Sequence, residues 1–233
     1  MNKTNNKGKV YVVGVVIFTV LFIVGILELP YGTIQKVIFK FKVKNYLEQT
    51  YNEKMVVNKV TYLWDNIEPI HARVHPKNAE HLEFAVYPLI NSANAYYDNY
   101  PETLWLHQVR EDLELLLEHT DRDIKPEFSI DFACCMERDR VRVSNGEIIA
   151  YSEANLKFDL SFQLNHSKPT DDLEQAVHII TRLKQHEALN IEHVSFMLQP
   201  EPGDLTSNIE YKVPGRDLHN INSIEELEAY KQK

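Results

Sequence analysis

The residues best placed to do chemistry lie in the segment EPIHARVHP, residues 68–76, where His71, Arg73 and His75 occupy every second position. Alternate side chains of a strand point to the same face, so these three are predicted to share one face. With His81 they could offer three imidazoles to a zinc ion. However, the Arg73 cation lies between them, and no carboxylate or cysteine stands at ligand spacing. We therefore predict a solvent-exposed face that binds a partner, and no metal site.

The second chemical candidate is the pair Cys134-Cys135. Neighbouring residues in a strand point to opposite faces, which places Cys134 in the core and Cys135 on the surface. The chain holds only these two cysteines and no C-x-x-C motif, so neither a disulfide framework nor a structural zinc site is expected. Two separate reduced thiols are the prediction. An enzyme that uses Cys135, or the face of His71 and His75, remains an alternative.

Several common catalytic and cofactor motifs are missing from the sequence. It has no phosphate-binding G-x-x-x-x-G-K-[ST], no dinucleotide-binding G-x-G-x-x-G and no G-x-S-x-G nucleophile elbow. The carboxylates of Glu111, Asp112 and Glu114 are predicted on the polar side of a helix, in solvent. We therefore expect no cofactor and no catalytic residue, and a protein that is not an enzyme.

The charge of the chain excludes nucleic acid as a partner. Its 25 basic and 34 acidic residues give a net charge of −9. Without Lys3, Lys7, Lys9 and Glu28, 22 basic and 33 acidic residues remain, a net charge of −11 for the rest of the chain. Phosphate backbones require a basic surface, which this composition does not provide.

An apolar run without charge or proline, VYVVGVVIFTVLFIVGIL, extends from Val10 to Leu27. With the next two residues it reaches about 20 residues, the length of a helix that crosses a bilayer. A cleaved signal peptide is the alternative, but its apolar core is usually shorter and ends at small residues, which ELPYGTIQK lacks. The prediction is a short N-terminal tail over residues 1–9 and a transmembrane helix over residues 10–29 that contacts membrane lipid.

Lysines flank the apolar run on both sides: Lys3, Lys7, Lys9, Lys36, Lys40, Lys42 and Lys44. Basic residues close to a membrane helix favour the cytoplasmic side, and Lys9 adjoins the run directly. We therefore predict a single-pass protein of the cell membrane, with a cytoplasmic N-terminus and the main domain outside the cytoplasm.

The rest of the chain is predicted to be of the α+β class, with two small units in which a helix covers an antiparallel sheet. Segments such as LKFDLSFQLN alternate apolar and polar residues, as strands with one buried face do. The polar stretch 87–100 is taken as the boundary. The first α+β domain is therefore placed at residues 33–88 and the second at residues 98–233. Ser223 followed by Glu226 predicts a capping box at the start of a last helix.

Several phrases of the first half are similar to those of a known family. The first is KNYLEQTYNEKMVVNKVTYLW, whose last residue begins the aromatic-acidic pair Trp64-Asp65. The others are PIHARVHPK, LEFAV and YDNYPETLW. In these phrases the chain resembles the YfjL-like membrane-anchored proteins of Gram-positive bacteria. The resemblance implies a two-part, cystatin-like or PepSY-like α+β protein without an assigned activity, and it transfers no catalytic residue.

Taken together, the sequence predicts a membrane-tethered, non-enzymatic module that binds a peptide or a protein, with His71, Arg73 and His75 as the partner-binding face. An accessory structural subunit of an envelope complex is the alternative. The sequence leaves the partner and the oligomeric state open.

Overall fold

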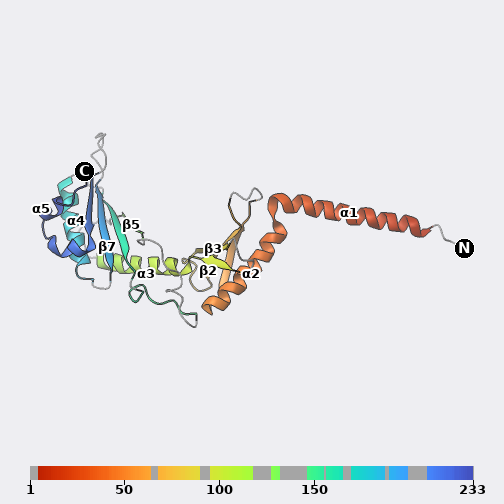
Figure 1. The fold of residues 1–233 in the computed structure, drawn as a ribbon, viewed down its shortest axis with the longest axis horizontal. Helices are drawn as coiled ribbons and strands as arrows, with labels where there is room; N and C mark the ends of the chain where they lie inside the picture. The colour runs from red at the N-terminus through yellow and green to blue at the C-terminus, as the bar shows by residue number, and fades with distance from the viewer. Residues whose placement is uncertain are drawn as a thin grey trace. The chain divides into compact units, whose positions relative to one another are not determined.

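The computed structural model of the chain describes residues 5–63, 68–89, 95–117, 127–131, 146–154, 156–164, 169–186, 189–198 and 209–232. The chain forms two compact units, Met1–Thr103 with Ser144–Glu147, and Leu104–Val143 with Ile148–Lys233. Each unit contains a four-stranded sheet with helices, so the fold is α+β (Figure 1).

The predicted transmembrane helix over residues 10–29 is wrong. Helix α1 (Asn5–Tyr31) forms, but among the described residues no helix has both the length and the apolar character needed to cross a membrane. The single-pass topology and the lipid contact predicted for these residues depended on that helix.

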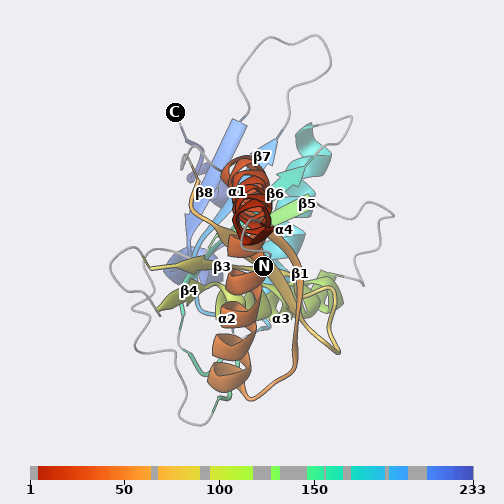
Figure 2. The same cartoon turned by 90° about the vertical axis from the view of Figure 1, so that its right-hand side faces the viewer.

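The first unit pairs one long helix with an antiparallel sheet. Helix α2 (Thr33–Tyr51) leads directly into strand β1 (Met55–Thr61). Three further strands follow, β2 (His71–Pro76), β3 (Phe84–Pro88) and β4 (Tyr96–Asp98). They pair in chain order, β1-β2-β3-β4, each antiparallel to the next, and α2 lies along this sheet (Figure 2).

Helix α2 packs on the sheet through one stripe of apolar side chains. Phe39, Val43 and Leu47 recur every fourth residue and are buried, as expected for one face of a helix. The alternate residues of the strands meet them and are also buried: Met55, Val57, Ala72, Val74, Phe84 and Val86. This packing occupies one face of the sheet, and the residues in between point to the other face.

Strand β4 is joined to α2 by a buried carboxylate. Asp98 is 6% exposed, and its Oδ2 accepts a hydrogen bond from the Tyr46 hydroxyl at 2.7 Å. Its Oδ1 accepts from the Tyr51 hydroxyl at 2.6 Å and from the Tyr100 backbone N–H at 3.3 Å. The polar stretch predicted as a boundary, residues 87–100, thus contains a strand of the first sheet, because buried hydrogen bonds satisfy its polar groups.

The second unit has a mixed sheet. Helix α3 (Tyr100–Leu117) enters this unit at Leu104. The elements that follow it are β5 (Glu127–Asp131), β6 (Phe158–Leu164), α4 (Pro169–Leu183), β7 (Ile191–Leu198), β8 (Ile209–Pro214), the 3₁₀ helix η2 (Gly215–Asn220) and α5 (Ile224–Glu228). The strand order is β5-β6-β7-β8. Strands β6 and β7 are parallel, so the prediction of a purely antiparallel sheet is wrong here. Helix α4 connects them, and parallel neighbours require such a crossover.

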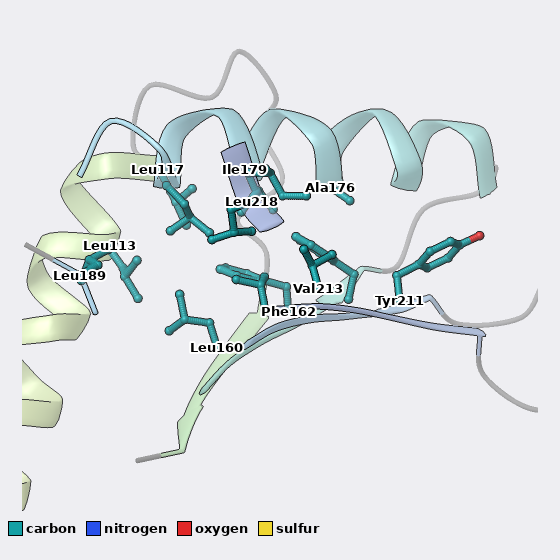
Figure 3. Close-up of a cluster of buried hydrophobic side chains, with 14 of the residues drawn as sticks. Leu113, Leu117, Leu160, Phe162, Ala176, Ile179, Leu189, Tyr211, Val213 and Leu218 are labelled. Atoms are coloured by element: carbon teal, nitrogen blue, oxygen red, sulfur yellow. The ribbon is translucent and has the colours of Figure 1, made fainter. Parts of the chain in front are cut away.

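The core of the second unit lies between this sheet and its helices. Figure 3 shows side chains of β6 and β8 rising toward α4, with Leu113 and Leu117 of α3 beside them. The rings of Phe162 and Phe196 stack at 5.4 Å between centroids. The Trp105 indole N–H donates to the Ile149 carbonyl at 2.8 Å, which satisfies a polar group at the core boundary.

The capping box predicted from the last helix is confirmed. The Ser223 hydroxyl accepts from the Glu226 backbone N–H at 3.3 Å, and the Glu226 carboxylate accepts from the Ser223 backbone N–H at 3.2 Å. The two bonds satisfy N–H groups that would otherwise lack partners at the start of a helix.

We expect Asp98→Ala to lower the free energy of unfolding by about 3 kcal/mol, because two tyrosine hydroxyls lose a charged, buried acceptor. Urea denaturation followed by circular dichroism measures this change. Glu80→Ala, which removes an exposed carboxylate of the same unit, is the control and should change the value by less than about 0.5 kcal/mol. Equal effects of the two substitutions would contradict the proposed role of Asp98.

Candidate functional site

The candidate site is the face of the first sheet opposite α2. His71, Arg73 and His75 alternate in β2 with Ala72 and Val74, which are buried on the α2 side. The three predicted residues therefore share one face, as their spacing predicts. In the described part of the chain, α2 is the helix packed on this sheet, and it lies on the other side.

The exposure of these three side chains differs from the prediction. Arg73 is exposed, with 60% of its side-chain surface accessible. His71 and His75 are buried, at 8% and 6% exposure, so the prediction of two solvent-exposed histidines is wrong. Neighbouring strands and loops supply the groups that cover them, which the sequence of β2 alone cannot indicate.

His75 is held by oxygen atoms at both ring nitrogens. Its Nδ1 lies 2.8 Å from the Pro76 carbonyl oxygen, and its Nε2 lies 3.1 Å from Oδ1 of Asn58. The Asn58 amide donates from Nδ2 to Oε2 of Glu83 at 3.0 Å, which fixes the orientation of the amide. A neutral imidazole has one N–H and can donate to one of the two oxygens, whereas the doubly protonated ring satisfies both.

Glu83 connects this chain of bonds to Arg73. Nη1 of Arg73 donates to Oε1 of Glu83 at 3.0 Å. Hydrogen bonds from the Asn58 amide and the Arg73 guanidinium hold the pKa of Glu83 below its ordinary value of 4.5. The result is a polar network, His75–Asn58–Glu83–Arg73, that positions the arginine at the surface.

Aromatic rings form a row beside Arg73. The His71 ring lies 5.2 Å from that of Tyr87, and the Tyr87 ring stacks on that of Tyr97 at 6.4 Å between centroids. These residues come from β2, β3 and β4, so the row crosses three strands. Such ring separations are typical of favourable aromatic contacts. We call His71, Arg73, Tyr87 and Tyr97 together the open face.

The two histidines lie too far apart to share a metal ion. They are four residues apart in one strand, about 13 Å along its axis, whereas two zinc-bound nitrogens lie within about 4 Å of one another. In the described ranges, no three histidine, cysteine, aspartate or glutamate side chains cluster closely enough to hold a metal. His81 is exposed, in the loop between β2 and β3. Cys134 and Cys135 lie outside the described residues.

Sequence reasoning placed three residues of this site and missed Asn58, Glu83, Tyr87 and Tyr97. Tyr87 could have been found, since it alternates with the buried Phe84 and Val86 in a predicted strand. Asn58 could not, because the pairing of β1 with β2 shifts by one residue between Val57 and Lys59. Such a bulge changes which side chains lie opposite each other.

Comparison with known proteins adds one distant similarity. No known family model and no curated protein matches the chain. The solved structure of a DUF5037 family protein from Ruminococcus gnavus is similar with a TM-score of 0.38 and 13% sequence identity, over 82% of this chain and 98% of that one. A likeness of this degree carries no argument about function, and the resemblance to YfjL-like proteins stays a prediction.

We predict that Glu83→Gln destabilises the chain by no more than about 1 kcal/mol, since the ion pair is exposed, and that the loss depends on pH. The pKa of Glu83 is lower in the folded state than its ordinary value of 4.5. Its contribution to the free energy of unfolding is therefore present above pH 4.5 and is lost as the pH falls through the folded-state pKa. Urea unfolding of both proteins between about pH 3 and pH 7 measures the difference. A difference in unfolding free energy between the two proteins that stays constant over this pH range would contradict the proposed role of Glu83 in the network.

Proposed function

We propose that this protein is a non-enzymatic module that binds a peptide or a protein on the open face. The observation that carries the proposal is the combination of an aromatic row with an exposed arginine on a sheet face that no described helix covers. Tyrosine and arginine dominate the binding energy of protein interfaces, because they combine a large contact area with directed hydrogen bonds.

The arginine is prepared for binding by its surroundings. The ion pair with Glu83 restricts the Arg73 side chain before any partner arrives, which lowers the conformational entropy lost on binding. The guanidinium has five N–H donors, and one of them is used by Glu83. A partner with a carboxylate or carbonyl oxygen beside an apolar side chain fits this surface.

Binding on the face is favoured over strand addition at an edge. Strand β1 is seven residues long and pairs with β2 through an irregular register near Asn58, with the exposed Lys59 next to it. Bulges and lysines are devices by which natural sheets discourage an added strand. Strand β4 has only three residues, which offers few backbone groups to a partner strand.

Catalysis by the histidines is less well supported. A general base needs a ring nitrogen within reach of a substrate proton. Both nitrogens of His75 face oxygens of the chain, and Nδ1 of His71 lies 3.2 Å from the Pro69 carbonyl oxygen. The burial of both rings further limits contact with a substrate.

An accessory subunit that assembles through α1 is the second candidate. The apolar side chains of this helix from Val10 to Ile26 are 40–77% exposed, and large exposed apolar surfaces commonly mark interaction sites. If this helix mediates assembly, deletion of residues 1–31 abolishes association measured by analytical ultracentrifugation. An unchanged sedimentation profile would remove this candidate.

The main proposal is tested with random peptides displayed on phage and selected on the immobilised full-length chain. We expect the selected peptides to bind about tenfold more weakly after Arg73→Ala or Tyr87→Ala, because each change removes a central contact of the open face. Fluorescence anisotropy of labelled peptides measures the affinity.

Phe41→Ala provides a matched control, because Phe41 is an aromatic residue of the same unit, 66% exposed on α2. It should leave the peptide affinity unchanged. Selection that recovers no peptide, or peptides that bind equally to the Tyr87 variant, would contradict the proposal.

A further inference from the structure

A polar hollow in the second unit lies apart from the open face. It has a volume of about 540 Å³ and is lined by Lys157, Asn190, Glu192, His193, Gly215 and Arg216, with Ile191 and Pro214. These residues come from the segments where β6 and β7 begin and where β8 ends. Sites for small molecules typically range from about 300 to 1,000 Å³, so the hollow is large enough for such a ligand.

The hollow is shaped by a close approach of two backbone segments. A Cβ atom at Gly215 would lie 1.9 Å from the Ile191 carbonyl oxygen, so only glycine fits at this position. The beginning of η2 is thereby held against the beginning of β7, which fixes the wall between them. Substituting Gly215 would push these segments apart.

Two cationic side chains, Lys157 and Arg216, line this hollow together with one carboxylate, Glu192. Lys157 is exposed, and the structure assigns it no hydrogen bond or ion pair within the described residues. Arg216 is 86% exposed and pairs with Asp217 only through Nε, at 3.9 Å. Such an exposed pair is weak, so most of the guanidinium donors are available to a ligand.

His193 is oriented by a neighbouring carboxylate. Its Nδ1 lies 3.0 Å from Oδ1 of Asp159, on the adjacent parallel strand. Because a carboxylate only accepts hydrogen bonds, Nδ1 carries the proton in this pair. Nε2 is then the ring nitrogen that remains for a ligand.

We propose that the hollow binds a small hydroxylated phosphomonoester, of the chemical class of the sugar phosphates. Lys157 and Arg216 match the double negative charge of the phosphate, and arginine recognises phosphate oxygens with paired donors. The Glu192 carboxylate can accept hydrogen bonds from the carbon-bound hydroxyl groups of such a ligand, which inorganic phosphate lacks. A volume of about 540 Å³ also leaves room for an organic group beside the phosphate.

The test is isothermal titration calorimetry of the full chain with glucose 6-phosphate, inorganic phosphate and glucose at constant ionic strength. We expect glucose 6-phosphate to bind most tightly, inorganic phosphate more weakly and glucose not at all. Lys157→Ala and Arg216→Ala should each weaken the binding of glucose 6-phosphate about tenfold, since each removes one cation from the phosphate site. Circular dichroism confirms that the variants are folded.

Lys212→Ala is the matched control, because Lys212 is an exposed lysine of β8 that does not line the hollow. It should leave the affinity unchanged. Equal affinity for inorganic phosphate and glucose 6-phosphate would overturn the assignment to a phosphomonoester. The absence of binding up to millimolar concentrations, or equal losses in all three variants, would overturn the site itself.

Discussion

The first unit depends on one buried carboxylate. Asp98 accepts hydrogen bonds from the hydroxyls of Tyr46 and Tyr51 on α2 while it sits at the end of the short strand β4. Charge-assisted hydrogen bonds of this kind are stronger than neutral ones, and they offset the cost of removing the carboxylate from water. They hold α2 on one side of the sheet. The opposite side carries Arg73 and Tyr87, and it is the side on which we propose that a partner binds.

The second unit is organised by apolar packing instead. Its core combines Trp105 of α3, Phe162 and Phe196 of the parallel strands and Ile179 of α4, all fully buried. With the core side of the sheet closed, polar residues such as His193 alternate with buried ones such as Val194. The phosphomonoester site proposed for this unit lies at the ends of the strands, where loops bring charged side chains together.

Much of the secondary structure could be predicted from periodicity. The alternation in β2, β3 and β6 follows from burial on one side. Strand β4 could not be found this way, because its Tyr96–Asp98 segment resembles a polar loop until the buried partners of Asp98 are known. The parallel pairing of β6 with β7 is a property of the whole sheet, and local pattern does not encode it.

The candidate site was predictable only where one strand defines it. The spacing of His71, Arg73 and His75 gave their common face, but their burial depends on other strands and loops. Glu83 follows the period-two pattern, but its contact with Arg73 depends on the strand beside it, and Asn58 lies at an irregular register. The transmembrane helix was predicted from the length and apolar character of residues 10–29, and no helix among the described residues meets both requirements.

Hydroxyl-radical footprinting of the chain with and without a selected peptide tests the central claim most directly, because it reports the exposure of individual side chains. The account predicts that bound peptide lowers the oxidation of Tyr87 and leaves that of Phe41, on the other side of the sheet, unchanged. Unchanged oxidation of Tyr87 together with protection of Phe41, or of residues in the second unit alone, would contradict it.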